Sequence, residues 1–402
     1  MNSIENIKCI VLLFLLACTI SAQGSAPKDK GSSAAPAATG ATAGAKGSGS
    51  GTFDVKDYGA AWTEACAATG NPTIVVSDGS YLLGPVNFEG PCKAPITIQL
   101  NGKLLGSTNL GAYKENWVVF YKVTGLTITG TGTFDGQGAS AWPSNKCRSG
   151  GACKTFPMSV VFAFVENGAI RGIKSLNSKY FHFNIFSSKN IEISNVGITA
   201  PEDSPNTDGI HLGDVSNITI ADTTIGTGDD CISIGPGSTD VTITGVNCGP
   251  GHGISIGSLG KYANEKDVSG ITVKGCTLTK TTNGLRIKTF QNNPSPVKAD
   301  NIHFEDITMD HVTNPILIDQ QYCPNGACTA GVSTVAIRDV TFKNIKGIAS
   351  NSQTITINCS EKVPCTQISL SNIQVTCPAG STNVTCANAK GQADGTLKHP
   401  CF

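Results

Sequence analysis

The hexapeptide Asp208-Gly-Ile-His-Leu-Gly213 returns three times along the chain with the same alternation of aliphatic and small or polar residues. The later copies are Asp230-Cys-Ile-Ser-Ile-Gly235, His252-Gly-Ile-Ser-Ile-Gly257 and Asn283-Gly-Leu-Arg-Ile-Lys288. The first three copies begin 22 residues apart, and the fourth begins 31 residues after the third. Repetition at this distance is typical of a solenoid, and the alternation within each copy is that of a β-strand. We therefore expect an all-β fold, a right-handed parallel β-helix.

The repeat predicts which side chains meet. In a β-helix the chain returns to the same strand one coil later, so residues at equal positions of the repeat lie side by side. Asp208, Asp230 and His252 would then be neighbours, with Arg286 and Lys288 on the outer side of the next coil. Strict alternation would turn the first three inward, unless a turn before each strand breaks it. Turn-forming residues stand there in all three copies, so we expect these side chains to reach one common face.

A second pattern marks another face of the same coils, where small polar residues turn the corner before each strand. Its copies are Asn190-Ile-Glu-Ile193, Asn217-Ile-Thr-Ile220, Asp240-Val-Thr-Ile243, Gly270-Ile-Thr-Val273 and Asn301-Ile-His-Phe304. Residues 60–68 favour a short helix, which would cap the open N-terminal end of the solenoid. We see no second domain and assign residues 52–402 to one catalytic β-helix.

The N-terminus has the pattern of an exported protein. Lys8 precedes an apolar run and a small-residue stretch, so residues 1–22 read as a secretory signal peptide that is too short to span a bilayer. Residues 23–51 are nearly all Ala, Gly, Ser, Thr, Pro and Lys, which predicts a flexible linker. We expect a protein secreted to the extracellular space or cell wall, with no membrane attachment after signal cleavage.

Cysteine and charge usage agree with export. Of 16 cysteines, two fall in the signal peptide, and the spacing of the others suggests disulfides. The expected pairs are Cys66/Cys92, Cys147/Cys153, Cys231/Cys248, Cys323/Cys328 and Cys359/Cys365. Glycosylation sequons begin at Asn217, Asn358 and Asn383. With 29 basic and 29 acidic residues the chain carries no net charge, so nothing global favours nucleic acid and any attraction for an anion must be local.

The clustered acids point to glycoside hydrolysis. That reaction needs one protonated carboxyl to release the leaving oxygen and one ionised carboxylate to activate water or attack. Asp208 and the adjacent pair Asp229-Asp230 supply carboxyls on consecutive coils, and like charges held close together push their pKa values apart. Arg286 and Lys288 suit a sugar that carries a carboxylate. The inferred substrate is an acidic polysaccharide.

Four motifs in order carry a family resemblance. Asn206-Thr-Asp208, Gly228-Asp-Asp230, Gly251-His-Gly253 and Arg286-Ile-Lys288 resemble the signatures of polygalacturonases, glycoside hydrolase family 28. Longer stretches around three of these motifs, residues 204–211, 249–260 and 283–289, are similar to plant pollen-type exopolygalacturonases in particular. Ala60 continues directly into Ala61-Trp-Thr-Glu-Ala-Cys66, which departs from the family pattern and predicts a shortened N-terminal cap.

The resemblance implies hydrolysis of α-1,4-galacturonosyl linkages in polygalacturonate (pectin) by an inverting, exo-acting enzyme. It implies that Asp229 is the general acid, that Asp208 and Asp230 hold and deprotonate the attacking water, and that His252 supports the protonation of the acid. It assigns substrate binding to Arg286, Lys288, Tyr322 and Asn206. It implies no cofactor, and we expect a monomer.

Other readings stay open. An endo-polygalacturonase, a Ca²⁺-dependent pectate-lyase-like enzyme and a non-catalytic wall-binding solenoid are the rival functions. A metal held by the acids and His252 would be opposed by the neighbouring cations. For His211 and His182, substrate contact and structural hydrogen bonding are equally compatible with the sequence.

Overall fold

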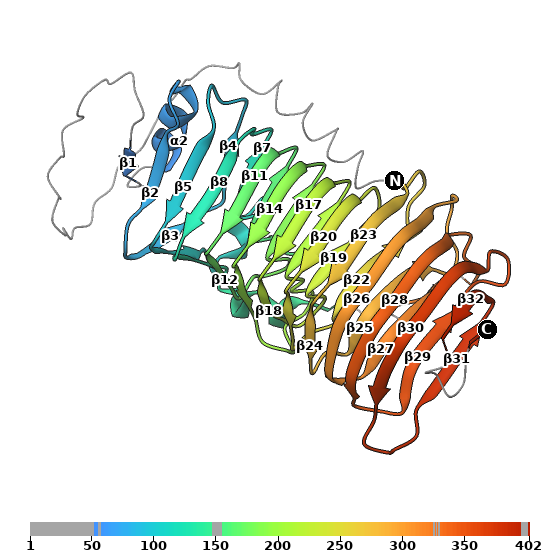
Figure 1. The fold of residues 1–402 in the computed structure, drawn as a ribbon. Coiled ribbons are helices and arrows are strands. Elements are labelled where there is room, and N and C mark those ends of the chain that lie inside the picture. The colour runs from blue at the N-terminus through green and yellow to red at the C-terminus, as the bar shows by residue number, and fades with distance from the viewer. Residues whose placement is uncertain are drawn as a thin grey trace, which may run out of the picture. The chain divides into compact units, whose positions relative to one another are not determined.

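The computed structural model describes residues 52–54, 58–146, 155–324, 326, 328, 330–394 and 401–402. The predicted signal peptide, the whole of the predicted linker and the Cys147/Cys153 pair lie outside these residues. The described chain winds into a right-handed parallel β-helix whose coils follow one another from β1 to β32 (Figure 1). All of its strand pairs are parallel, as the repeat predicts. No helix among the described residues is long and apolar enough to cross a membrane.

Each coil contributes strands to three ladders. The first ladder contains β1 (Thr52–Asp54), β2 (Thr73–Val76), β5 (Ile96–Leu100), β8 (Leu126–Gly130), β11 (Glu166–Arg171), β14 (Lys189–Ser194), β17 (Ser216–Ala221), β20 (Thr239–Thr244), β23 (Val268–Lys274), β26 (Lys298–Val312), β28 (Ala336–Ala349), β30 (Cys365–Thr376) and β32 (Ala389–Ala393). The second contains β3 (Ser80–Leu83), β6 (Lys103–Gly106), β9 (Thr133–Asp135), β12 (Lys174–Leu176), β15 (Gly197–Thr199), β18 (Thr224–Gly226), β21 (Asn247–Cys248) and β24 (Thr277–Thr279), and it merges with the first at β26.

The third ladder is a separate sheet that carries the hexapeptide repeat. It contains β4 (Val86–Glu89), β7 (Val118–Tyr121), β10 (Val160–Ala163), β13 (Phe183–Phe186), β16 (Ile210–Gly213), β19 (Ile232–Ile234), β22 (Ile254–Leu259), β25 (Asn283–Phe290), β27 (Asn314–Tyr322), β29 (Gln353–Asn358) and β31 (Asn383–Ala387). Three short 3₁₀ helices lie in the connections: η1 (Leu110–Ala112), η2 (Gly138–Ser140) and η3 (Trp142–Ser144).

Aliphatic columns fill the interior of the coils. Ile210 pairs with Ile232, which pairs with Ile254, and each of the three is fully buried. Burying such a side chain stabilises the fold by about 1.5–3 kcal/mol. The strict register of these columns fixes which outward side chains become neighbours.

The corner residues of the second sequence pattern behave as predicted. Asn190, Asn217, Asp240 and Asn301 all have positive φ, a conformation that Asn and Asp tolerate better than most residues, and Gly270 takes their place in one coil. The Nδ2 of Asn217 donates to the Oδ1 of Asn190 in the coil below at 2.8 Å. The corner is therefore braced by a ladder of side-chain amides.

The N-terminal helix α2 spans Tyr58–Ala67, two residues ahead of the predicted start. Its Trp62 is buried and packs against Phe88 and Phe120 with ring centroids 4.9 and 6.0 Å apart. A disulfide from Cys66 to Cys92 ties the helix to the coils. The helix therefore covers the apolar end of the solenoid, as a terminal cap must.

The cysteine pairing confirms four of the five predicted disulfides, and the fifth pair lies outside the described residues. The four bonds are Cys66–Cys92, Cys231–Cys248, Cys323–Cys328 and Cys359–Cys365. A further bond joins Cys386 to Cys401, a pair whose spacing we did not single out. The Cys231–Cys248 bond adjoins the acidic pair. In the chain-entropy model, closing a loop of this length stabilises the folded protein by about 3 kcal/mol.

Candidate active site

Turns before three consecutive strands present the acidic residues. The strands begin at Ile210, Ile232 and Ile254, so the first residue of each hexapeptide copy precedes the strand by two positions. These residues lie in the connection from the second ladder to the third, which is why they escape the inward alternation. Within one such turn a Cβ at Gly228 would lie 1.9 Å from the carbonyl oxygen of Ser204, so only glycine fits beside Asp229. The break in alternation that the sequence required is confirmed.

Asp230 lies between two cations. Its Oδ1 is 2.6 Å from Nη2 of Arg286, and its Oδ2 is 2.7 Å from Nζ of Lys288. The hydroxyl of Ser255 also donates to Oδ1 at 2.9 Å. Burial alone would raise the pKa of Asp230, but Lys288 and Arg286 outweigh burial and lower that pKa to about 2. Asp230 therefore stays ionised to a lower pH than an ordinary aspartate.

Asp208 is in the opposite state. Burial is the main cause that raises its pKa well above the ordinary value, and the charges of Asp229 and Asp230 add to it. Lys288 and a 2.9 Å hydrogen bond from Ser233 lower that pKa but do not compensate. Asp208 therefore keeps its proton to a higher pH than an ordinary aspartate.

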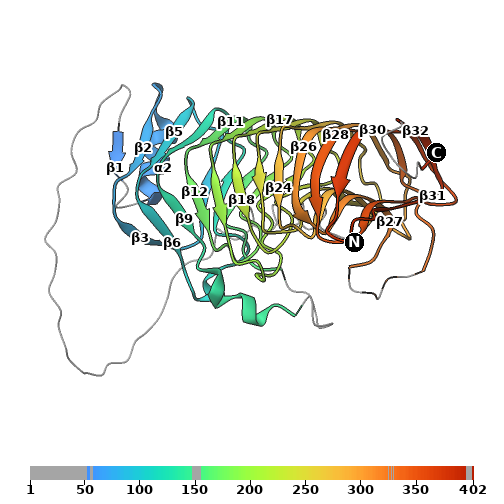
Figure 2. The same ribbon diagram turned by 60° about the horizontal axis from the view of Figure 1, so that its bottom comes forward.

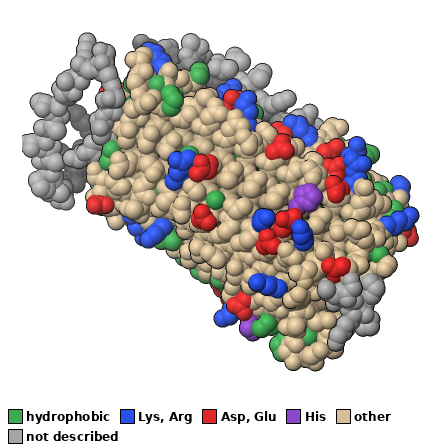
Figure 3. Space-filling model, viewed as in Figure 1, with side chains coloured by type: hydrophobic (Ala, Val, Ile, Leu, Met, Phe, Trp, Pro, Cys, Tyr) green, Lys and Arg blue, Asp and Glu red, His purple; other side chains and the backbone are tan. Residues whose placement is uncertain are grey.

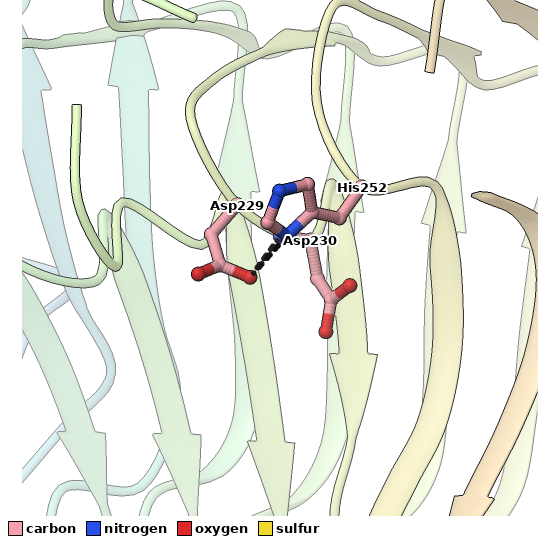
Figure 4. Close-up of side chains that lie close together, drawn as sticks. All are labelled: Asp229, Asp230 and His252. Carbon is pink, nitrogen blue, oxygen red and sulfur yellow. Dashed lines mark hydrogen bonds and ion pairs between the residues drawn. The ribbon is translucent and has the colours of Figure 1, made fainter. Parts of the chain in front are cut away.

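Asp229 is the most accessible of the three carboxyls, with 18% of its side chain exposed. Its Oδ1 lies 3.0 Å from Nδ1 of His252 and accepts the backbone N–H of Asp230 at 2.9 Å. Figure 4 shows the imidazole over this carboxyl, with Asp230 beside it. Asp229 is thus oriented by two partners while it still faces solvent, where a substrate could reach it.

The electrostatic cluster is visible on the surface. Figure 3 shows acidic, basic and histidine side chains gathered near the middle of the face that Figure 1 presents. An open pocket lies beside His252, with Glu202, Asp203 and Thr282 among its lining residues. The residues that the sequence predicted to converge are therefore assembled at one accessible place.

Asp229, Asp230 and His252 are also close enough to hold a cation, since their possible ligand atoms all lie within 4.8 Å of one another. Both oxygens of Asp230 are, however, already paired with Arg286 and Lys288. A divalent ion there would face two positive charges at short range and would have to displace them. The donor set fits an acid–base site better than a metal site.

Tyr322 and Asn206 flank the acids differently. The Nζ of Lys288 lies 5.3 Å from the ring centroid of Tyr322, and Phe290 packs edge-on against the same ring at 5.5 Å. Asn206 is a turn residue with φ 54°, and its Oδ1 accepts the amide of Asn145 at 3.3 Å. Tyr322 therefore belongs to the cationic side of the site, whereas Asn206 ties the turn of Asp208 to an earlier connection.

The two remaining candidate histidines differ. His182 is fully buried and bonds to the hydroxyl of Ser175 at 2.8 Å, and burial lowers its pKa to about 3. His211 points outward from β16 and bonds to Ser233 at 2.8 Å. His182 is structural, while His211 lies next to the acids and holds the serine that bonds to Asp208.

Sequence reasoning missed several residues of the site. Ser233 and Ser255 occupy the position of His211 and Arg286 in their hexapeptide copies, so the register alone could have identified them. Tyr180, whose pKa is raised by burial and by the charges of Asp208 and Asp229, lies in the connection from β12 to β13. This connection belongs to neither repeat, so no sequence signal marks the residue.

The comparisons with known proteins identify the family. The sequence pattern described as "Glycosyl hydrolases family 28" matches residues 66–398. The chain belongs to glycosyl hydrolase family 28. This family 28 chain is 49% identical to an exopolygalacturonase of Zea mays, over 97% of the chain and 98% of that protein. It is therefore a glycosidase, as the acids predicted.

Solved structures agree on the fold of this family 28 protein. An exopolygalacturonase from Thermotoga maritima aligns with a TM-score of 0.71 at 18% identity, over 85% of this chain and 90% of that one. An endo-xylogalacturonan hydrolase from Aspergillus tubingensis aligns with a TM-score of 0.73 at 25% identity, over 86% and 100%. Because the first acts at chain ends and the second within chains, the shared coil does not by itself separate exo from endo action.

Proposed function

We propose that the protein hydrolyses α-1,4-galacturonosyl linkages of polygalacturonate and releases galacturonate from a chain end. The observation that carries the proposal is the convergence of three carboxyls, one imidazole and two cations on one accessible face of a family 28 β-helix. The full-length similarity to an exopolygalacturonase supports the exo mode.

The local charge suits an acidic sugar. Arg286 and Lys288 supply two positive charges, and ionised Asp230 balances one of them. A positive excess therefore remains beside Tyr322 for the carboxylate of a galacturonate residue, and the raised pKa of Asp208 keeps that carboxyl from offsetting it as fully as an ordinary aspartate would. A neutral galactan would gain nothing from this excess.

The roles of the acids follow from their exposure and charge. Asp229 donates its proton to the leaving glycosidic oxygen, and His252 at 3.0 Å supports that proton. Asp230, and Asp208 once it has released its proton, hold the water that attacks the anomeric carbon. The carbon–oxygen bond to the leaving sugar breaks as the water bond forms, and the water's proton passes to a carboxylate. Direct attack by water inverts the anomeric configuration.

Two measurements test this function. Chromatography of early products from polygalacturonate should show saturated galacturonate monomer only, and chelators should not slow its release. NMR of the first-formed sugar should show the β-anomer from the α-linked chain. Unsaturated products would favour the lyase reading, no products at all would favour a wall-binding solenoid, and the α-anomer first would replace inversion by retention.

The site also supports proposals about where the protein acts. A signal peptide over residues 1–22, a linker over 23–51 and secretion to the cell wall fit the disulfide-bonded coils and a pectin substrate. We further propose that the protein works as a monomer, which gel filtration with light scattering would test.

A further inference from the structure

The surface on the N-terminal side of the acids is built from stacked rings. The connection from β12 to β13 occupies the corner that holds Asp208 in the next coil, and it carries Tyr180 and Phe181. These two rings stack at 4.4 Å with 17° between their planes. Phe181 in turn contacts the ring of His211 at 4.8 Å. The stack therefore stands directly beside the coil that presents Asp208.

The stack is linked to the acids through His211, which bonds to Ser233, the hydroxyl that donates to Asp208. Burial raises the pKa of Tyr180, and the charges of Asp208 and Asp229 raise it further. The phenol is therefore neutral while it lies within electrostatic reach of both acids. A neutral, bulky ring at this place takes up space beside the acids and offers no cation to a sugar carboxylate.

A rigid support stands behind these rings. The indole nitrogen of Trp142, in η3, donates to the carbonyl of Ser178 at 3.1 Å, and the amide of Gly138 donates to the carbonyl of Asn177 at 2.7 Å. The short teal helices of this segment project from the coils at the bottom of Figure 2. Lys179, next to Tyr180, is 2% exposed and donates to the carbonyl of Gly136. Its ammonium group also lies 4.9 Å from the ring centroid of Tyr113.

The opposite side of the acids has the reverse chemistry. Arg286, Lys288 and Tyr322 lie on later coils and leave a positive excess beside Asp230. A polyanionic chain is favoured on that side, whereas the stacked rings of Tyr180 and Phe181 on the other side carry no charge that would attract it. The two sides of the acids are therefore unequal for a galacturonan.

We infer that Tyr180 and Phe181 form a wall that stops a galacturonan chain on the N-terminal side of the acids, so that only a chain end enters the site. The inference rests on the proposed function and assigns its exo mode to two named side chains. The remainder of the chain runs over Arg286, Lys288 and Tyr322 toward the later coils. Tyr180 and Phe181 are specificity-determining residues and take no part in bond cleavage.

The experiment removes the wall and counts early products. An oligogalacturonate of defined length, labelled at its reducing end, is digested by wild type, Tyr180→Ala and Tyr180→Ala/Phe181→Ala. Wild type should release monomer only. In the variants, early labelled chains that have lost two or more sugars in a single cut should become on the order of tenfold more abundant relative to chains that have lost one sugar, the discrimination that one side chain in a pocket typically gives.

Two control variants test whether the bulk of the Tyr180 ring matters, rather than its hydroxyl group or the loss of any tyrosine. Tyr180→Phe keeps the wall and should still release only monomer. Tyr121→Ala removes a tyrosine of β7 that packs edge-on against Phe164 at 5.7 Å, away from the acids, and it should also leave the product pattern unchanged.

A binding measurement tests the inference in variants whose turnover is too slow for product analysis. In the Asp229→Asn background, affinity should follow the concentration of chain ends, so short oligomers should bind better than an equal mass of long polymer. Adding Tyr180→Ala should abolish that preference. Monomer-only products, or a retained preference for chain ends, in the wall variants would overturn the inference. Mixed oligomers from wild type would instead overturn the proposed exo function.

Discussion

Asp208 and Asp230 hold the same place in two consecutive coils, yet the pKa of Asp208 is raised and that of Asp230 is lowered. Each accepts a hydrogen bond from a serine of the following coil at 2.9 Å, from Ser233 and Ser255 respectively. Each is almost fully buried. The repeat therefore builds two equivalent sites for a carboxyl, and the difference in charge comes from elsewhere.

The difference in pKa arises one coil beyond the serines. In the outward column of the third ladder, His211, Ser233, Ser255 and Arg286 pair in succession. Asp230 has Arg286 two coils ahead, whereas the equivalent residue for Asp208 is Ser255. Lys288 bonds to Asp230 from the same strand as Arg286. With a single cationic strand at the end of a repeat, the pKa values of two equivalent carboxyls thus shift in opposite directions.

The largest effect on activity is expected at Asp229, the carboxyl that lies next to Asp208 and Asp230. Asp229→Asn should lower kcat by about 10²–10⁴-fold, because an amide cannot protonate the leaving oxygen. Asp240→Asn, at an exposed corner with positive φ, should have no effect and serves as the control. Steady-state kinetics on polygalacturonate decides the matter. Near-normal turnover by Asp229→Asn would transfer the acid role to Asp208, whose raised pKa makes it the competing candidate.

The next effect concerns the cations that distinguish the two carboxyls. Lys288→Met removes one partner of a buried ion pair and should destabilise the protein by about 3 kcal/mol, with a raised KM for galacturonan. Lys266→Met breaks a surface pair with Asp214 of similar length, 2.6 Å against 2.7 Å, in which the lysine side chain is 69% exposed, and it should cost no more than about 1 kcal/mol. Denaturant unfolding measures both. Equal losses would show that the buried pair does not hold Asp230.

The smallest effect separates the two serines. The hydrogen bond from Ser233 lowers the pKa of Asp208, so Ser233→Ala should raise it further. Asp208 must be ionised to receive the water's proton, and activity is lost as the pH falls through its pKa. The acidic limb of kcat should therefore move upward by roughly 0.5–1 pH unit, the size expected for one hydrogen bond.

Ser255→Ala is the matched variant. Lys288 and Arg286 remain and keep the pKa of Asp230 low, so the acidic limb should stay in place. Since Ser255 also accepts from Nε of Arg286 at 2.9 Å, its loss should appear in KM instead. Equal shifts of the acidic limb in the two serine variants would contradict the assigned difference between the carboxyls.

Much of this site could be predicted from the sequence because the solenoid converts spacing into contact. Equal positions of the repeat become neighbours, so the cluster of Asp208, Asp230 and His252 and the outward placement of Arg286 followed from counting residues. The same logic predicted the bond between Cys231 and Cys248.

Other features depend on quantities that spacing does not contain. The raised pKa of Asp208 follows from burial and from the charges of Asp229 and Asp230, and both effects depend on distances that only coordinates give. The sequence assigned Lys288 to the substrate alone, whereas its Nζ is also paired with Asp230. Tyr180 lies in a connection without periodicity, and its approach to the acids depends on the support from η3.

The central claim is that the equivalent carboxyls of Asp208 and Asp230 have different pKa values, so that over a range of pH one is protonated and the other is ionised. Neutron diffraction tests this claim most directly. At about pH 5, where an ordinary aspartate is ionised, deuterium-exchanged crystals should show a deuteron on the carboxyl of Asp208 and none on Asp230. A deuteron on Asp230, or two carboxyls that are both ionised, would contradict the account.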